Sequence, residues 1–432
     1  MLRNYLKIAL RSIKKNLGHT LINITGLSAG IAAFLLIFLF AGFELSYDTF
    51  HTKKDRIFRV RNDRIYKNIH DKSAGCPPAV GPALLKDYPE VETFARVHNA
   101  SWTSPVITVN PGTPAAAAFN RPLFYADASF LKMFSFRIKE GNDSVLAQPD
   151  TAVITDSLAK KYFGEDSPVG KIVTLSTSMG TRDISITGLM EDVPANSHIK
   201  FEFLVSYKTL VALEKKADYV WGWNSFNTFI LLKPGTDWRA LQAKLPGMVK
   251  KYNNDGDDYK RRYLLQPLTS IHLHSNLRHE PGINGNIHTV NFLMIIAFFI
   301  IAVSWVNFIN LSTAQSVLRA KEVGIRKVLG SGRFQLIKQF FFESALLNFA
   351  SALIAAAAVY EALPLFCRLV GRPLSLSILG SIWGWLVLAF LAGIFITGIY
   401  PAFVLSSFKA ETVLKGRFGH SKRGLKLRKI LV

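Results

Sequence analysis

The sequence predicts a membrane protein in which four transmembrane α-helices carry one large extracytoplasmic α+β domain, inserted between the first and second helices. Three observations support this fold class. The mean hydropathy is +0.21 and only 19% of the residues are charged, whereas soluble globular proteins average about 25%. Four apolar runs are long enough to span a bilayer. The net charge of +22 is concentrated in three short segments that flank those runs.

The four predicted spans are residues 21–43, 290–311, 340–360 and 382–405. The first contains no charged residue, and at about 1.5 Å per residue it crosses a hydrocarbon core of about 30 Å. The third is interrupted only by Glu343. A buried helix of a soluble protein could explain one such run, but four runs argue against it. A cleaved signal peptide is also disfavoured, because its apolar region has only about 7–15 residues.

The positive charge orients the predicted spans. Residues 1–20 carry a net charge of +5, residues 319–338 carry +5 and residues 406–432 carry +7, whereas the long 44–289 segment carries only +5. Four crossings put the three short segments on one side of the membrane, and the positive-inside rule makes that side the cytoplasm. Both termini are therefore expected in the cytoplasm. Nucleic-acid binding is disfavoured, since the basic residues cluster at membrane boundaries and not on one folded face.

Small and polar residues within the spans predict helix packing. Gly26 and Gly30 are four residues apart, a spacing that lets two helix backbones approach closely. Asn307 and Asn310 share one face of the second span, where amides seek partners on neighbouring helices. We favour packing over a substrate path for both pairs. Residues 1–20 predict a basic amphipathic helix, which either lies in the cytoplasmic membrane interface or only anchors the topology.

Residues 44–289 are too many for a loop and are expected to fold as an α+β domain with at least one βαβ-type unit. Thr151–Ile154 predicts a strand, and a helix capped by Thr155 or Asp156 follows it and ends at Gly164. Asp127 is expected to cap another helix. Further strands are predicted at residues 172–175 and 184–186, and a surface loop at residues 110–118.

The sequence offers no convincing catalytic or metal-binding motif. Residues 164–171 (GEDSPVGK) depart from the phosphate-binding loop, with five residues between the glycines where four are needed. An acidic patch, Asp255, Asp257 and Asp258, lacks the downstream Glu of a calcium loop. Four histidines lie near the second span: His272, His274, His279 and His288. We expect them to line a polar strand edge and not to form a metal site. We therefore predict neither an enzyme nor a metal-binding protein.

Residues 307–314 (NFINLSTA) and 319–331 (RAKEVGIRKVLGS) form the most distinctive stretch of the sequence. They occur together with SYDTFH at 46–51, KKYFG at 160–164, DVPANSH at 192–198 and IYPA at 399–402. In combination these motifs resemble the FtsX-like/MacB-like permease family of ABC transporters, in particular the tandem permeases common in Bacteroidota. The resemblance extends along nearly the whole chain.

The resemblance implies a permease subunit with a MacB-like periplasmic core domain, served by a separate cytoplasmic ABC ATPase. That partner would bind ATP and Mg²⁺, and no cofactor is expected in this chain. Residues 319–331 would form a short coupling helix that docks on the ATPase. The residues assigned to this contact are Arg319, Lys321, Glu322, Val323, Gly324, Arg326 and Lys327. The alternative is that the basic residues only satisfy the positive-inside rule.

The implied mechanism is mechanical transmission of ATP hydrolysis to the periplasmic domain, for export or extraction of a peptide, lipoprotein or lipid. The alternative is a regulatory complex that controls a periplasmic hydrolase or a histidine kinase without transport. The expected location is the bacterial inner membrane. The expected partners are the ATPase, membrane lipids, a second permease half and, for export, a periplasmic adaptor and an outer-membrane channel.

The second permease half would be either another copy of this chain or the C-terminal half of a longer tandem permease. We favour the tandem arrangement, because the sequence closes on a basic run that turns apolar, residues 427–432.

Overall fold

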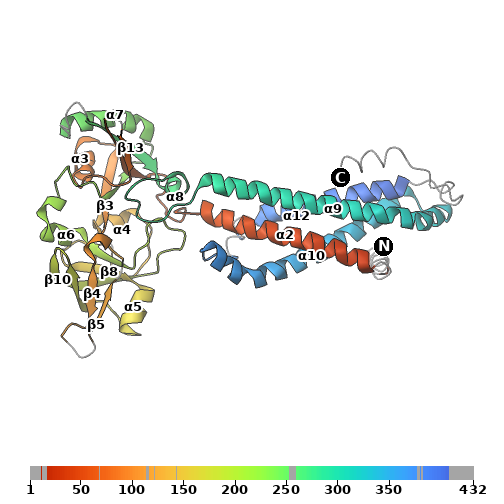
Figure 1. Ribbon diagram of the computed structural model, residues 1–432, viewed down its shortest axis with the longest axis horizontal. Helices are drawn as coiled ribbons and strands as arrows, with labels where there is room; N and C mark the ends of the chain where they lie inside the picture. Colours follow the sequence, from red (N-terminus) through yellow and green to blue (C-terminus); the bar gives the residue numbers. More distant parts are fainter. Residues whose placement is uncertain are drawn as a thin grey trace. The chain divides into compact units, whose positions relative to one another are not determined.

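The computed structural model describes residues 11, 17–67, 69–112, 116–120, 122–142, 144–252, 259–376, 380 and 383–407. The chain divides into two compact units (Figure 1): a helical unit of Met1–Phe43 and His288–Val432, and a sheet unit of Glu44–Ile287. Most of the predicted segments 1–20 and 406–432, and the acidic patch at 255–258, lie outside the described residues.

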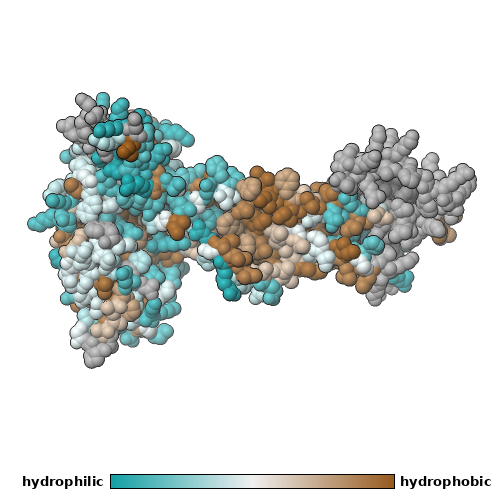
Figure 2. Space-filling view, in the orientation of Figure 1, coloured by the Kyte–Doolittle hydropathy of each residue, from teal (hydrophilic) through white to brown (hydrophobic). Residues whose placement is uncertain are grey.

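The described part of the helical unit contains helices α2 (Leu17–Leu45), α9 (Ile287–Val328), α10 (Arg333–Val370) and α12 (Trp383–Ser407). Three of them are long and apolar enough to cross a membrane: α2, α10 and the Ile287–Ala314 part of α9. In α12 the apolar helix among the described residues is shorter, Leu386–Ile399. Figure 2 shows hydrophobic residues at the surface of this unit, as expected of helices that face lipid.

The second predicted span and the predicted coupling helix are one continuous helix, which corrects the expectation of two separate helices. Helix α9 runs for 42 residues and includes residues 319–328. The reason is local, because the stretch that follows Asn310 is rich in helix formers and contains no proline. The helix ends at a turn in which Gly330 adopts a positive φ of 93°. Helix α10 then begins at Arg333, well before the predicted start of the third span.

In the described part of the sheet unit, 13 strands form one sheet. Their order is β13-β1-β12-β3-β6-β11-β8-β10-β9-β4-β5, while β2 pairs with β1 and β7 with β10. The strands are β1 (Ile57–Tyr66), β2 (Ile69–Ser73), β3 (Val91–Asn99), β4 (Val106–Val109), β5 (Ala117–Asn120), β6 (Leu123–Ala126), β7 (Ile138–Glu140), β8 (Thr151–Thr155), β9 (Ile172–Thr177), β10 (Gly180–Met190), β11 (Phe203–Ser206), β12 (Asn227–Leu232) and β13 (Tyr259–Pro267).

Short helices cover both faces of this sheet (Figure 1). Helices α3 (Val80–Asp87) and α7 (Trp238–Tyr252) pack on the face of β1 that presents Phe58 and Val60. Helix α4 (Ser129–Met133) packs in the core that contains Ile57, so alternate residues of β1 enter different cores. Helices α5 (Asp156–Phe163) and α6 (Tyr207–Leu213) complete a third core, built with β4, β8, β9 and β10.

The predicted βαβ-type unit is present. Strand β8 leads into α5, and β8 pairs in parallel with β10, the second strand of the following hairpin. Gly164 follows α5 with a positive φ of 64°, as its predicted place at the helix end requires. The predicted loop at residues 110–118 is wrong at its C-terminal end, because Ala117–Asn120 forms β5 and pairs with β4.

Two predicted helix caps are wrong. Thr155 precedes α5 but its hydroxyl makes no capping bond, and the Asp156 carboxylate pairs with Lys139 and Lys160. Asp127 does not cap α4, since its carboxylate accepts three hydrogen bonds from Arg96 at 2.8–3.0 Å. The bidentate pair joins two opposite charges in two parallel bonds, whereas a cap would join the Asp127 carboxylate to a neutral backbone N–H.

Candidate functional site

Helices α2 and α9 approach each other closely at the two glycines of the first span. A Cβ atom added at Gly30 would lie 1.9 Å from Ser304 Oγ, which no real structure tolerates. A Cβ at Gly26 would lie 3.3 Å from Asn307 Nδ2. The absence of side chains at these positions therefore lets α9 pack against α2. Asn310 is partly buried one turn further along α9.

Helices α10 and α12 are joined by a buried polar contact. Asn348 Nδ2 donates to Thr397 Oγ1 at 2.9 Å, and Thr397 Oγ1 donates to the Gly393 carbonyl at 2.7 Å. Both side chains are buried. A Cβ at Gly393 would lie 3.1 Å from the Trp305 indole nitrogen, so α12 also fits closely against α9. The bundle thus satisfies these polar groups internally, as an apolar environment requires.

The turn between α9 and α10 has a fixed geometry. Ser331 N donates to the Arg326 carbonyl at 3.0 Å and Gly330 N donates to the Lys327 carbonyl at 3.1 Å, the pattern of a Schellman motif. Helix α10 restarts at once, and Gln335 Oε1 accepts from Gly332 N at 3.2 Å. Both helix ends are therefore capped, and the turn holds its side chains in defined positions.

This turn exposes four large apolar side chains, which we call the turn surface. Ile325 is 52% exposed, Val328 65%, Leu329 81% and Phe334 78%. Basic residues surround them: Arg326 donates to Gln339 Oε1 at 2.6 Å, while burial and then the Arg333 charge lower the pKa of Lys327. An exposed apolar group rimmed by charge is typical of a surface that docks a partner.

The structure divides the predicted coupling residues into three groups. The backbones of Arg319, Lys321 and Glu322 lie in α9, but their side chains lie outside the described part of the chain. Val323 and Gly324 are buried, and Val323 packs with Leu336, Phe340 and Ala402. Among the predicted coupling residues whose side chains the structure describes, Arg326 and Lys327 lie beside the turn surface. The apolar residues of the turn surface were not among the predicted coupling residues, although the spacing of Ile325, Val328 and Leu329 within the basic run was a usable signal.

A second group of contacts lies where the sheet unit begins in the sequence. Asp48 is fully buried, and His198 N donates to its Oδ1 at 3.1 Å. His198 Nδ1 lies 2.8 Å from Asp48 Oδ2, although the angle is unfavourable for a hydrogen bond. Burial alone would raise the pKa of Asp48, but His198 outweighs it and lowers the pKa. Burial lowers the pKa of His51 to about 4, so this ring is neutral near pH 7.

His272, near the C-terminal end of the sheet unit, contacts residues at the N-terminal end of the same unit. His272 Nε2 lies 2.7 Å from Glu44 Oε2, and the His272 ring stacks on Tyr47 with centroids 3.3 Å apart. His272 and His274 belong to the short helix α8 (Ile271–His274), so the expected polar strand edge is wrong. Among the described residues, no three His, Cys, Asp or Glu side chains are arranged to hold a metal ion.

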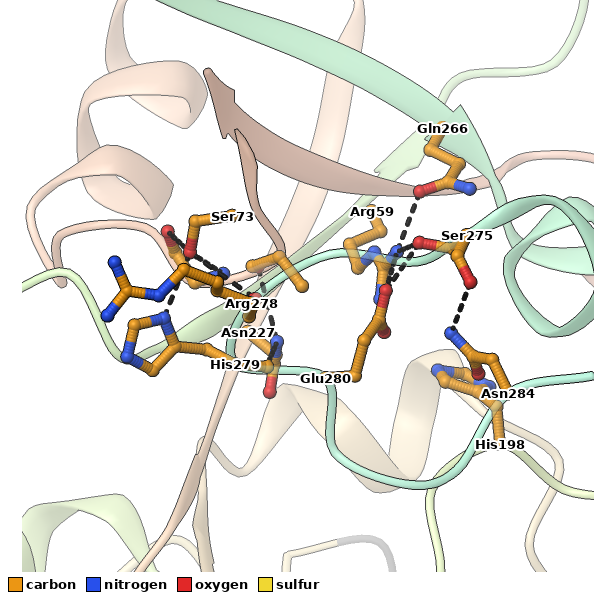
Figure 3. A network of polar contacts seen from close by, with 12 residues as sticks. Arg59, Ser73, His198, Asn227, Gln266, Ser275, Arg278, His279, Glu280 and Asn284 are labelled. Atoms are coloured by element: carbon orange, nitrogen blue, oxygen red, sulfur yellow. Dashed lines mark hydrogen bonds and ion pairs between the residues drawn. The ribbon is translucent and has the colours of Figure 1, made fainter. Parts of the chain in front are cut away.

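A buried arginine fixes the segment that follows α8 (Figure 3). Arg59 of β1 is fully buried, and its Nη2 donates to Gln266 Oε1 and Ser275 Oγ at 2.7 Å and to Glu280 Oε1 at 3.0 Å. Asn284 Nδ2 donates to the Ser275 carbonyl at 3.1 Å. These contacts bind residues 275–284 to the sheet. Local sequence patterns could not indicate the contacts of Arg59, because its partners are more than 200 residues away.

Comparison with known proteins identifies the family of both units. The family described as MacB-like periplasmic core domain matches residues 20–247, more than half of the chain. The family described as FtsX-like permease C-terminal matches residues 294–412. The chain belongs to the FtsX/MacB-like permeases of ABC transporters. Membership makes it a membrane protein whose family works with an ATPase, and it fits a transport subunit without catalytic activity of its own.

Individual relatives are distant from this permease. The ABC transporter permease YknZ of Bacillus subtilis (strain 168) is 23% identical over 311 residues, which cover 71% of this chain and 69% of YknZ. A solved permease domain from Porphyromonas gingivalis is 23% identical with a TM-score of 0.44, covering 50% of this chain and 91% of that chain. The periplasmic region of MacB from Actinobacillus actinomycetemcomitans is 13% identical with a TM-score of 0.33, covering 46% of this chain and 87% of that chain.

Proposed function

We propose that this permease transmits the work of a separate cytoplasmic ATPase to its sheet unit, which lies outside the bacterial inner membrane. Its four helices α2, α9, α10 and α12 cross the membrane, with both termini in the cytoplasm. The positive charge of the segment 319–338 supports this orientation. The proposed cargo is an amphipathic peptide, lipoprotein or lipid that is exported or extracted at the outer face.

The turn surface is the observation that carries the proposal. It combines four exposed apolar side chains with neighbouring positive charges at the end of the two longest helices. Apolar anchors of this kind supply most of the binding energy of a protein interface, while the charges set orientation. The capped turn joins α9 and α10 directly, so a push on the turn surface moves both helices.

The contacts where the two helices join the sheet unit support the proposed transmission of helix movement to that unit. Helix α2 continues directly into residues 46–51, which Asp48 binds to His198. Helix α9 is preceded directly by the segment that Arg59 holds through Glu280. Displacement of either helix would therefore pull on residues that are bound to the body of the sheet unit and not on free linkers.

A matched pair of substitutions on α10 tests the contact with the ATPase. Phe334 and Leu369 are 78% and 76% exposed, and they lie at opposite ends of the same 38-residue helix. We expect Phe334→Asp to weaken co-purification of the ATPase at least tenfold, and Leu369→Asp to leave it unchanged. An acidic residue in the first turn of a helix is favourable, so Phe334→Asp should not unfold α10. Equal co-purification with both variants would refute the docking surface.

A further inference from the structure

Ile283 is the most exposed large apolar side chain among the described residues, at 89%. It lies in the short loop Pro281–Asn286, between the segment that Arg59 holds and the start of α9. By comparison, the most exposed apolar side chain elsewhere in the described sheet unit is Ile69, at 68%. An isoleucine held in water loses the favourable free energy of burial, so its transfer into an apolar environment would be favourable.

Hydrogen bonds fix the loop on both sides of Ile283, and Figure 3 shows those of Glu280 and Asn284. On the N-terminal side, Glu280 accepts hydrogen bonds from Arg59 and Ser275. On the C-terminal side, Asn284 Nδ2 donates to the Ser275 carbonyl at 3.1 Å, and Gly285 N donates to the His272 carbonyl at 2.9 Å. These bonds hold the backbone on either side of the exposed isoleucine.

Two glycines bring the loop into close contact with the rest of the sheet unit. A Cβ at Gly282 would lie 3.0 Å from the His198 carbonyl oxygen, and a Cβ at Gly285 would lie 2.5 Å from Glu44 Oε2. The loop backbone is therefore packed down while Ile283 between them points into solvent. The side chain cannot bury itself by a simple rearrangement, because the loop has no room to turn over.

The chain places Ile283 near the membrane. Helix α9 and its membrane span both begin at Ile287, four residues later. Four residues reach at most about 14 Å even when extended. The polar headgroup zone on each side of the hydrocarbon core is itself several ångströms thick, since the whole bilayer measures about 40–45 Å and the core about 30 Å. Ile283 is thus within reach of the outer leaflet.

We propose that the Ile283 loop inserts into the outer leaflet and anchors the base of the sheet unit on the lipid surface. The partner is the acyl-chain boundary beneath the headgroups, which accepts an apolar side chain without needing a matching protein. The inference rests on α9 crossing the membrane, as in the proposed function, but not on docking of the ATPase. The sheet unit would then contact the membrane through this loop as well as through its two connecting helices.

Spin labelling of the full chain in lipid nanodiscs tests the insertion. The background is Cys367→Ser; Cys76 can stay, because it is fully buried and burial raises the pKa of its thiol to about 12. Labels at Ile283→Cys, Ile69→Cys and Phe299→Cys are compared by their relative collision rates with oxygen, which enters lipid, and with a water-soluble nickel complex. Ile69 is the exposed control on the sheet unit, and Phe299 is a 68% exposed residue of α9.

We expect the oxygen-to-nickel ratio at 283 to exceed that at 69 several-fold and to approach that at 299. A ratio at 283 equal to that at 69 would overturn the insertion. A label at 283 that neither reagent reaches would also overturn it, since it would mean burial against protein. A water-like ratio at 299 would instead refute the membrane span of the proposed function, which keeps the two failures distinguishable.

Discussion

Replacing Glu280 by glutamine keeps the side-chain shape but removes the charge that faces Arg59. The guanidinium is fully buried and the Glu280 side chain is only 10% exposed, so water cannot compensate for the lost charge. Breaking a buried ion pair in this way costs about 3–5 kcal/mol. We expect the lower end of that range, about 3 kcal/mol, because Gln266 and Ser275 still accept hydrogen bonds from Arg59.

Hydrogen exchange of the full chain measures this loss where it occurs. A cost of about 3 kcal/mol corresponds to a factor of about 150 in the local opening equilibrium, so the amide of Gly285 should exchange about two orders of magnitude faster. The control is Glu92→Gln. Glu92 Oε2 pairs with Arg56 Nη1 at 2.8 Å, and this pair lies at the surface, with the Glu92 side chain 42% exposed. An exposed pair contributes only about 0–1 kcal/mol.

The reasoning would be refuted if Glu280→Gln and Glu92→Gln accelerated exchange at Gly285 equally. A variant that combines Arg59→Met with Glu280→Leu removes both charges. It distinguishes the stability lost with the ion pair from the cost of leaving Arg59 buried without its partner charge. Apolar residues of similar volume often replace a buried pair without loss. We therefore expect slower exchange in the combined variant than in Glu280→Gln alone.

Two further predictions concern α2 and the acid limit of the fold. Gly30→Ala should lower the midpoint of thermal unfolding in detergent, because its methyl group would meet Ser304. Gly18→Ala, with no atom within 4 Å, should leave the midpoint unchanged or raise it through helix propensity; the same shift in both would contradict the close approach of α2 and α9. His51 has a pKa of about 4 in the fold against 6.5 in the reference state, so the unfolded chain binds the proton first and stability falls as the pH drops from about 6.5 to about 4. Urea unfolding at pH 7 and pH 5 measures this loss of stability, and His51→Asn should make it smaller. His98, whose pKa is also lowered to about 4, should contribute part of the loss that remains. An unchanged loss of stability in His51→Asn would exclude His51 as its source.

Features set by neighbouring residues were predictable from the sequence. The first span, the strand β8 with its helix α5, and the Gly164 helix end all follow from local periodicity and from glycine's access to positive φ. The continuity of α9 through residue 328 was missed because a resemblance suggested a break that the sequence itself does not contain. A basic run without proline gives a helix no reason to stop.

Features set by long-range contacts were not predictable. Ile325 and Val323 are two residues apart in the same amphipathic stretch, yet Val323 is buried and Ile325 is exposed. Which of them faces outward depends on Leu336 and Ala402, which α10 and α12 supply. Asp127 likewise lies just before α4, but Arg96, 31 residues earlier in the sequence, binds its carboxylate. A local sequence pattern identifies the candidate capping side chain but not a distant residue that competes for it.

The motifs SYDTFH at 46–51 and DVPANSH at 192–198 meet in the fold, although 150 residues separate Asp48 from His198. Asn196 Nδ2 donates to both the Ser46 carbonyl and its hydroxyl at 3.0 Å, and Asp48 N donates to the Asn196 carbonyl at 2.9 Å. Side-chain and backbone bonds therefore hold the residues that follow α2 against a loop of the sheet unit. Residues tied in this way resist extension away from the sheet unit, which is the property that the proposed mechanical transmission from α2 requires.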